Sequence, residues 1–337
     1  MTLKNKPILI IGGCGYIGSH IVKQLSERGF SPIVFDNLSS GHPDQRVHNE
    51  PLIIGDIGDS QLVQETLQKW SITDVIHLAG SIVVPDSIKE PASYYENNVS
   101  KTQKFFTTCS KNSVKNVIFS SSAAVYGPSS EILDEQHKTC PIHPYGRSKL
   151  MGEWILQDIA KAKDMNSIAL RYFNVAGASL DGKIGQRGAK STHLIKVAAE
   201  VVAGKRPYLT IYGTDYPTLD GTCIRDYIHV EDLASAHISA LEHLQKTTHT
   251  SLTMNCGYGH GLSVREVTNA IQKIYPEFAN KIKLGAQRVG DVPQLIASPK
   301  KIQQTLDWRP QHNNLNLMIR SACEWESKLQ TLNMENE

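Results

Sequence analysis

Short apolar runs and longer amphipathic stretches alternate along the first 173 residues. Continuous apolar runs are typical of strands that are buried on both faces, and they occur at 8–11, 33–35, 52–54, 75–78, 116–119 and 167–171. Between them, apolar residues recur at helical spacing at about 17–25, 60–70, 94–111 and 145–163. Strands and helices that alternate with short links predict an α/β fold with a doubly wound parallel sheet.

The pattern changes after Asn174. Prolines and glycines punctuate a loop-rich stretch, at Pro207, Gly213, Pro217 and Gly221. A helix near 230–244 and a strand near 252–255 then resume the earlier pattern. A chain of 337 residues is long enough for about two domains. We expect residues 1–173 plus 226–256 to form one domain around the parallel sheet, and residues 174–225 plus 257–330 to form a smaller mixed α/β domain.

A glycine-rich run lies between the first predicted strand and the first predicted helix. Residues 12–18 read Gly-Gly-Cys-Gly-Tyr-Ile-Gly, with glycines at 12, 15 and 18. Such a turn lets backbone N–H groups approach a pyrophosphate at a helix N-terminus. Asp36 closes the second strand, where a carboxylate accepts ribose hydroxyls and repels a 2′-phosphate. The sequence therefore predicts a Rossmann-type domain that binds NAD rather than NADP.

A second group of residues carries candidate catalytic chemistry. Ser120, Ser121 and Ser122 follow a predicted strand, and ligands bind at the carboxyl ends of strands in open α/β sheets. Tyr145 and Lys149 are four residues apart, so one helix face presents both. We expect the Lys149 ammonium to lower the pKa of the Tyr145 phenol, which would then act as a general base.

Composition excludes several other classes of protein. Hydrophobic residues make up 40% of the chain and the formal net charge is +2, so nothing indicates disorder or a nucleic-acid partner. The six cysteines form no Cys-x-x-Cys pair and the histidines show no metal-ligand spacing, so no metal is expected. Because no apolar run approaches 18 residues and no signal segment is evident, we expect a cytoplasmic protein without a membrane partner.

Taken together, the motifs resemble the extended short-chain dehydrogenase/reductase family, and within it the UDP-glucose 4-epimerases of the NAD-dependent epimerase/dehydratase group. The resemblance covers nearly the whole chain. It rests on the glycine-rich run, Gly55-Asp56-Ile57, His77-Leu78-Ala79-Gly80, the run Tyr-Tyr-Glu-Asn-Asn-Val at 94–99, the run Ser-Ser-Ser-Ala-Ala-Val-Tyr-Gly at 120–127, Pro144-Tyr145, and the segment 212–230.

The resemblance assigns a role to each matching residue. Tyr145 is the expected catalytic base, with Lys149 and Ser122 as its catalytic partners. The expected cofactor contacts are Gly12, Gly15, Tyr16, Ile17, Gly18, Asp36, Asn37, Asp56, Ile57, Leu78, Ala79, Gly80, Asn97, Ser120, Tyr145, Lys149 and Tyr172. The expected substrate contacts are Ser122, Tyr145, Asn174, His193, Leu194, Tyr212, Arg225, Arg288 and Asp291.

The implied reaction interconverts UDP-glucose and UDP-galactose. C4 of the sugar is oxidised reversibly with tightly bound NAD, and a 4-keto sugar turns over about its diphosphate link before it is reduced again. The resemblance also implies a homodimer through the helices near 94–111 and 145–163. Arg225 and Arg288 suit a diphosphate because arginine forms charge-assisted bonds to phosphate.

Several alternatives stay open at this point. Ile82 stands where many family members carry a lysine, Thr192-His193 replaces an asparagine pair, and Leu295 occupies the position expected to gate N-acetyl sugars. A UDP-N-acetylhexosamine or UDP-pentose 4-epimerase therefore remains an alternative. A dehydratase or decarboxylase is disfavoured, because Ala123-Ala124 supplies no acid or base. A non-catalytic NAD-binding regulator is disfavoured because Tyr145 and Lys149 are both present.

Overall fold

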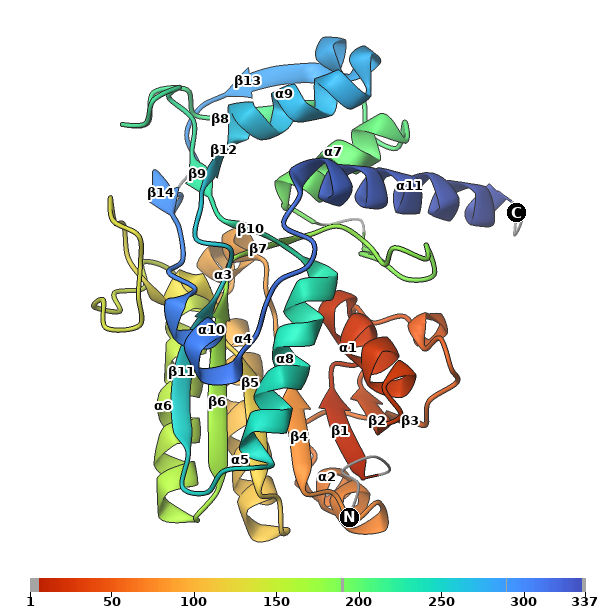
Figure 1. Cartoon of the computed structure of the whole chain (residues 1–337), viewed down its shortest axis with the longest axis vertical. Helices are drawn as coiled ribbons and strands as arrows, with labels where there is room; N and C mark the ends of the chain where they lie inside the picture. Colours follow the sequence, from red (N-terminus) through yellow and green to blue (C-terminus); the bar gives the residue numbers. More distant parts are fainter. Residues whose placement is uncertain (1–5, 189–190, 289, 335–337) are drawn as a thin grey trace.

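Seven parallel strands form one central sheet in the order β11-β6-β5-β4-β1-β2-β3 (Figure 1). The computed structural model describes residues 6–188, 191–288 and 290–334. The strands of the sheet are β1 (Pro7–Ile11), β2 (Ser31–Asp36), β3 (Leu52–Ile54), β4 (Asp74–His77), β5 (Asn116–Ser120), β6 (Asn166–Tyr172) and β11 (Ser251–Cys256). The doubly wound parallel α/β sheet predicted from the sequence is confirmed.

Helices cover both faces of this sheet, which is why its strands are apolar throughout. On one face lie α1 (Tyr16–Glu27) and α8 (Val230–Leu244), and on the other lie α2 (Ser60–Lys69), α5 (Lys101–Lys111) and α6 (Pro144–Ala162). The helix predicted over 94–111 consists of α4 (Pro91–Tyr95), a π-helical turn over Glu96–Ser100, and α5. π-helical turns inside helices are frequent at functional sites.

The direction in which the strands are added reverses between β1 and β4. β1 pairs with β2 on one side and with β4 on the other, and Ile11 lies in register with both Phe35 and His77. In open α/β sheets a ligand binds at such a reversal, outside the carboxyl ends of the strands. The glycine-rich turn after β1 and the segment after β4 both begin at this edge.

The remaining elements gather beyond the carboxyl ends of the strands, above the sheet in Figure 1. We call this part the cap, and define it as α7 (Leu194–Val202), α9 (Val264–Ile274), α11 (Leu315–Met334), β8 (Leu209–Tyr212), β9 (Ile224–Arg225), β12 (Leu262–Ser263), β13 (Ile282–Gly285) and β14 (Gln294–Leu295). Between cap and sheet, β7 (Asn174–Ala176) pairs with β10 (Tyr227–His229). Among the described residues, the α-helices not yet named are α3 (Val84–Lys89) and α10 (Lys300–Leu306).

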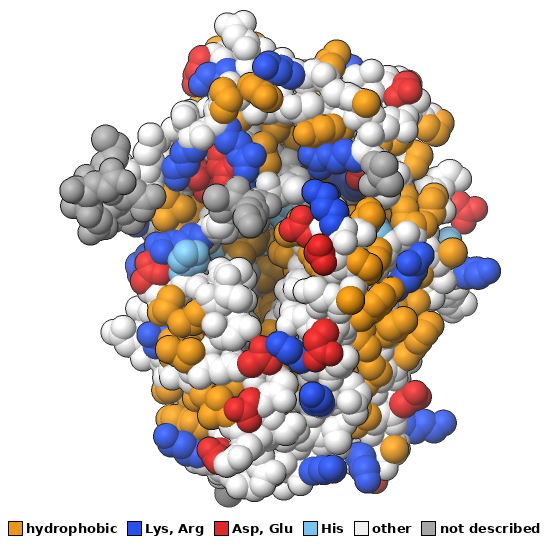
Figure 2. Space-filling model, turned by 180° about the vertical axis from the view of Figure 1, so that it is seen from behind, with side chains coloured by type: hydrophobic (Ala, Val, Ile, Leu, Met, Phe, Trp, Pro, Cys, Tyr) orange, Lys and Arg blue, Asp and Glu red, His pale blue; other side chains and the backbone are white. Residues whose placement is uncertain are grey.

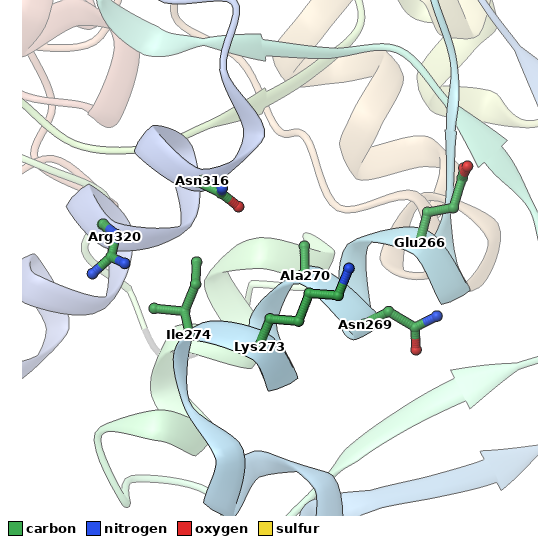
Figure 3. Close-up of a pocket in the computed structure, with 7 residues that line it drawn as sticks. All are labelled: Glu266, Asn269, Ala270, Lys273, Ile274, Asn316 and Arg320. Carbon is green, nitrogen blue, oxygen red and sulfur yellow. The ribbon is translucent and has the colours of Figure 1, made fainter.

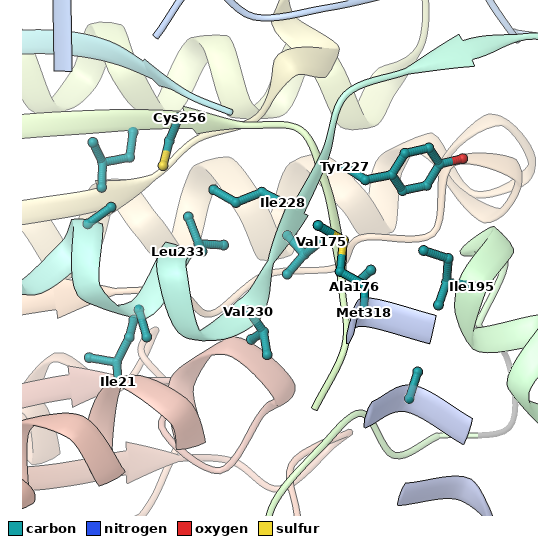
Figure 4. Close-up of a cluster of buried hydrophobic side chains, with 14 of the residues drawn as sticks. Ile21, Val175, Ala176, Ile195, Tyr227, Ile228, Val230, Leu233, Cys256 and Met318 are labelled. Atoms are coloured by element: carbon teal, nitrogen blue, oxygen red, sulfur yellow. The ribbon is translucent and has the colours of Figure 1, made fainter. Parts of the chain in front are cut away.

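One hydrophobic core runs from the sheet into the cap. It includes Ile21 of α1, Leu233 of α8, Ile228 of β10, Ile195 of α7 and Met318 of α11 (Figure 4). Because the same buried cluster includes residues of both parts, the cap is packed directly against the sheet and is not a separate body joined by a flexible linker. Among the helices that the structure describes, none is long and apolar enough to cross a membrane.

Candidate active site

The glycine-rich turn between β1 and α1 has little room for side chains. Gly12 has a φ of +79°, and a Cβ there would lie 3.0 Å from the backbone nitrogen of Ala79. A Cβ at Gly18 would overlap the carbonyl oxygen of Gly12, and the Gly15 N–H donates to that oxygen at 3.1 Å. The close backbone approach leaves the N-terminus of α1 open to an anionic ligand, as a pyrophosphate-binding turn requires.

The Asp36 carboxylate faces this turn from the end of β2. It is buried and accepts hydrogen bonds from the backbone nitrogens of Cys14 at 3.0 Å and Leu38 at 2.8 Å. A carboxylate offers about four acceptor sites, so sites remain for the two hydroxyls of a ribose. A Cβ at Gly41 would lie 2.9 Å from both carboxylate oxygens, so a glycine is needed for the backbone to pass this close to them. These residues fit the adenosine side of NAD.

A second carboxylate lies near the same end of the sheet. Asp56 accepts from Lys101 at 2.7 Å and from the backbone nitrogen of Gly58 at 2.8 Å. Partial burial raises its pKa, but the bonds from Lys101, Gly58 and Asn37 outweigh this, so the pKa is held below its usual value. Asn37, Asp56 and the neighbouring Ile57 therefore form one group beside the Asp36 strand, as expected for residues that meet an adenosine.

A side chain that sequence reasoning missed positions the segment after β4. Asn98 accepts from the Ser81 backbone nitrogen at 2.8 Å, and donates to the Ser81 carbonyl at 2.9 Å and to Ser148 Oγ at 3.1 Å. The predicted cofactor residue Asn97 lies beside it and donates to Ser81 Oγ at 3.0 Å. Asn98 thereby ties the segment after Gly80 to helix α6. The doubled asparagine in the sequence was the available signal.

The candidate catalytic residues come together at the end of β5 and the start of α6. Pro144 begins the helix, Tyr145 is buried, and Lys149 lies one turn later. Lys149 Nζ donates to the Ser120 carbonyl at 2.8 Å, which holds the ammonium at the carboxyl end of the strand. Ser122 accepts from the backbone nitrogen of Ala124 at 3.2 Å and also hydrogen-bonds to Tyr145.

The expected effect of Lys149 on Tyr145 was wrong. Burial raises the pKa of the Tyr145 phenol, and the hydrogen bond with Ser122 is the interaction that opposes this rise. Burial lowers the pKa of Lys149 to about 8, while the Glu153 carboxylate acts against this fall. The ammonium points to the Ser120 carbonyl and not to the phenol, so helical spacing alone did not establish a Tyr–Lys interaction.

A buried ion pair joins the catalytic helix α6 to the neighbouring strand β6. Arg171 of β6 donates to both carboxylate oxygens of Glu153, from Nε at 2.9 Å and from Nη2 at 2.6 Å. Ser121 Oγ also donates to Glu153 through a short hydrogen bond. Ser120 and Ser121, which are adjacent at the end of β5, thus bind Lys149 and Glu153, which lie one turn apart on α6. Sequence reasoning did not find this pair, since the two residues lie on different elements.

His143 is a further residue that the sequence analysis missed. It caps α6 by accepting from the Gly146 backbone nitrogen at 3.1 Å through Nδ1, and its ring stacks on Tyr145 with centroids 6.0 Å apart. Because Nδ1 accepts, the proton of the neutral ring lies on Nε2. Burial, with help from the Arg147 charge, lowers the pKa of His143 and so favours this neutral form.

The expected substrate residues lie on the cap side of the same region. The Arg288 guanidinium stacks over the Tyr212 ring at 3.8 Å, and Arg225 lies 3.8 Å from the Asp291 carboxylate. A Cβ at Gly290 would lie 4.0 Å from the His143 ring, so this loop reaches the residues around Tyr145. The two arginines therefore lie on the cap side, and the catalytic helix α6 lies on the sheet side, of the space between the cap and the sheet. Figure 2 shows the surface hollowed between the cap and the sheet, with apolar side chains at the floor.

Other predicted residues have contacts that are mainly structural. Tyr16 donates to the Gly177 carbonyl at 2.6 Å, and Tyr172, whose pKa burial raises, hydrogen-bonds to Ser120. Asn174 begins β7, and its backbone nitrogen donates to the Asp226 carbonyl at 2.9 Å. His193 precedes Leu194 at the start of α7, and among the described residues its buried Nδ1 has no hydrogen-bond partner. The two remaining predicted residues, Ile17 and Leu78, pack their partly buried side chains against the core.

One cavity in the described part of the chain lies away from these residues. It has a volume of about 490 Å³ and lies in the cap between α9 and α11 (Figure 3). None of the predicted site residues lines it; its lining is Glu266, Asn269, Ala270, Lys273, Ile274, Asn316 and Arg320. In the described ranges, no group of three or more His, Cys, Asp or Glu side chains could hold a metal ion.

Comparison with known proteins links this geometry to a family. Residues 8–257 match the NAD dependent epimerase/dehydratase family. The chain is 45% identical over 330 residues to a UDP-glucose 4-epimerase of Azospirillum brasilense, covering 98% of this chain and 94% of that protein. The crystal structure of the Brucella ovis UDP-glucose 4-epimerase in complex with NAD is 41% identical, with a TM-score of 0.90 over 96% of this chain and 98% of that one.

A further solved structure has a broader name. The UDP-Glc/GlcNAc 4-epimerase of Campylobacter jejuni is 42% identical to this chain, with a TM-score of 0.82 over 96% of this chain and 100% of that one. All three proteins align over nearly their full length, and the family match spans the sheet with its glycine-rich turn and its Tyr–Lys helix. The chain belongs to the NAD dependent epimerase/dehydratase family.

Proposed function

We propose that this protein is an NAD-dependent UDP-glucose 4-epimerase that interconverts UDP-glucose and UDP-galactose. The observation that carries the proposal is the convergence of Ser122, Tyr145 and Lys149 at the end of β5. Only β4 separates this strand from β1, which leads into the glycine-rich turn. Full-length similarity to proteins named UDP-glucose 4-epimerase supports it.

The residues of this site suit reversible oxidation of a hydroxyl. NAD, when bound along the glycine-rich turn, would accept a hydride from C4 and return it. Tyr145 takes the proton of the 4-hydroxyl, and Ser122, which hydrogen-bonds to Tyr145, favours the phenolate that does so. Lys149 stays cationic at neutral pH and, with Ser120 and Asn97, would hold the nicotinamide end of NAD in place. The cofactor and substrate roles expected for the other residues are proposed on the contacts described above.

The cap residues suit the diphosphate link of the substrate. Arg225 and Arg288 carry positive charges on one side of the region, and their pairing with Asp291 and Tyr212 orients them. When the substrate is bound through its diphosphate, the sugar can rotate and present either of its two faces to the nicotinamide. Ala123 and Ala124 follow Ser122 without an acid or base, which supports oxidation and return rather than elimination of water or loss of carbon dioxide.

A second substrate class is supported by one position. Leu295 pairs in register with Arg225, and its half-buried side chain packs against a cluster that includes Ala123, Leu150 and Phe173. A leucine is smaller than an aromatic residue, so this position restricts a substituted sugar less than a tyrosine would. The similar protein named UDP-Glc/GlcNAc 4-epimerase favours the same alternative, an activity on UDP-N-acetylhexosamines.

Inversion at C4 measured by NMR tests both possibilities. Purified protein is incubated separately with UDP-glucose, UDP-N-acetylglucosamine and a UDP-pentose, and the signals of the 4-epimers are followed. We expect conversion of UDP-glucose without added reductant or net NADH production. Conversion of a UDP-pentose alone, or loss of the sugar's 6-hydroxyl as water, would contradict the proposal.

We expect the activity to decline as the pH rises above about 8. The Lys149 pKa lies near 8, so its ammonium is present below this pH and is lost above it. An arginine remains charged throughout this range. The pH profile of kcat/KM between pH 7 and 10 should therefore fall in the unaltered protein, while the weaker activity of Lys149→Arg should lack that fall. The same alkaline fall in both proteins would contradict the role of the ammonium.

We also propose that the protein forms a homodimer through α5 and α6, as the sequence resemblance implies. Trp154 supports this, since it lies on α6 with 53% of its surface exposed, unusual for so large an apolar side chain. We expect Trp154→Lys to shift the mass measured by light scattering at micromolar concentration from dimer to monomer. Leu284→Lys, an equally apolar exposed position in the cap, is the control and should leave the mass unchanged.

Two further expectations remain proposals. The division into residues 1–173 plus 226–256 and residues 174–225 plus 257–330 is supported by the return of α8 and β11 to the central sheet after the cap has begun. A cytoplasmic location is supported by the six cysteines, all of which are free thiols.

A further inference from the structure

The loop after β2 folds back over the glycine-rich turn. Cys14 of the turn donates its N–H to Asp36 at 3.0 Å and accepts the His42 N–H at its carbonyl oxygen at 2.9 Å. The backbone at Gly41 lies against the same residues, since a Cβ there would be 2.8 Å from the Cys14 Cβ. Residues 37–45 therefore cover the carboxylate that fits the adenosine ribose.

This loop is fastened to a segment more than 140 residues away. Arg187 binds both carboxylate oxygens of Asp44, from Nη1 at 3.0 Å and from Nη2 at 2.8 Å. Beside this pair, the buried Gln45 accepts from the Gly185 backbone nitrogen at 3.2 Å and donates to the Cys14 carbonyl at 3.4 Å. One carboxamide thus bridges the nucleotide turn and the segment before the cap.

Residues 185–186 of this distant segment are packed against helices α7 and α11. A Cβ at Gly185 would lie 2.6 Å from the Trp325 ring, so the glycine rests directly on helix α11. Trp325 Nε1 donates to the Gln186 carbonyl at 3.1 Å, and Lys196 of α7 donates to the same oxygen at 3.2 Å. Because two helices anchor residues 185–186, the contacts with Asp44 and Gln45 restrain the loop after β2 rather than the cap.

We infer that the Asp44–Arg187 pair and the Gln45 bridge form a clasp that slows the release of the dinucleotide. A ligand beneath a loop leaves only when the loop opens, so contacts that hold the loop closed reduce the release rate. Asp44 is 61% exposed, and an exposed pair changes a rate by about fivefold at most, equivalent to roughly 1 kcal/mol. Gln45 is buried, so its loss should have the larger effect. The identity of the dinucleotide as NAD rests on the proposed function.

Exchange of bound NAD for isotope-labelled NAD tests the clasp without reference to activity. Protein loaded with unlabelled NAD is placed in excess labelled NAD, and the labelled NAD that becomes bound is measured over time by mass spectrometry after denaturation. We expect Asp44→Asn to exchange about fivefold faster than the unaltered protein, and Gln45→Met to exchange faster still. The reversed pair, Asp44→Arg with Arg187→Asp, should restore slow exchange.

Salt and a matched control separate the clasp from general loosening. Asp307→Asn alters an exposed carboxylate 3.7 Å from Arg309 and should leave exchange unchanged. High salt should accelerate exchange in the unaltered protein but hardly in Asp44→Asn, which has no ion pair to screen. Equal exchange rates in the unaltered protein, Asp44→Asn and Gln45→Met would overturn the clasp alone. An unaltered protein that takes up no NAD would overturn both the clasp and the proposed function.

Discussion

The Tyr145→Phe protein is expected to bind NAD normally and to epimerise UDP-glucose about 10²- to 10⁴-fold more slowly than the unaltered protein, the range that a positioned general base contributes. Phenylalanine keeps the buried ring and its stacking on His143, so the site should keep its shape. The change removes only the hydroxyl that Ser122 contacts. The initial rate of inversion at C4 and the NAD content of the denatured protein are the two measurements.

Two controls keep this result interpretable. Tyr208→Phe removes a hydroxyl from a partly exposed tyrosine of the cap, whose ring lies 3.6 Å from Lys283 Nζ, and should leave the rate unchanged. The unfolding temperature of Tyr145→Phe should stay close to that of the unaltered protein. A nearly unaltered rate in Tyr145→Phe would show that another group takes the proton.

Replacing Glu153 by Gln is expected to lower the free energy of unfolding by about 3–5 kcal/mol, because Arg171 would remain buried without its partner charge. The Glu153 and Arg171 side chains are only 1% and 7% exposed, so solvent cannot replace the lost interaction. Glu153 also supports the charge of Lys149. We therefore expect the alkaline fall of kcat/KM to begin at a lower pH in Glu153→Gln. Urea unfolding and the pH profile test the two effects separately.

Two further variants distinguish the effect of a buried ion pair from that of a partly exposed one. Glu27→Gln breaks a pair with Lys23 in which the carboxylate is 43% exposed, and we expect a loss of no more than about 1 kcal/mol. Adding Arg171→Gln to Glu153→Gln removes the unpaired charge and should recover part of the stability. If Glu153→Gln unfolds within about 1 kcal/mol of the unaltered protein, the pair does not hold the catalytic helix as described.

The regular part of the fold was predictable from apolar periodicity, and α7 shows where that signal fails. Lys196 and Glu200 of this helix are buried, where they pair with each other at 3.4 Å, and Lys196 also pairs with Glu326 of α11. Lys196 and Glu200 lie four residues apart on one face of α7, and that face is buried in ion pairs instead of facing solvent, so the helix lacks the exposed polar face of a surface helix. From the sequence, the segment around α7 was accordingly expected to be loop-rich.

The order of residues along the chain determined the fold class, the nucleotide turn and the types of chemical group at the site, because these depend on local periodicity and on motifs of a few residues. Only the tertiary structure decided how the groups interact. It placed the Lys149 ammonium on the Ser120 carbonyl, stacked His143 on Tyr145, and joined Asp44 to Arg187. Such contacts link residues on different elements, and burial then sets the protonation of each group, which no local pattern encodes.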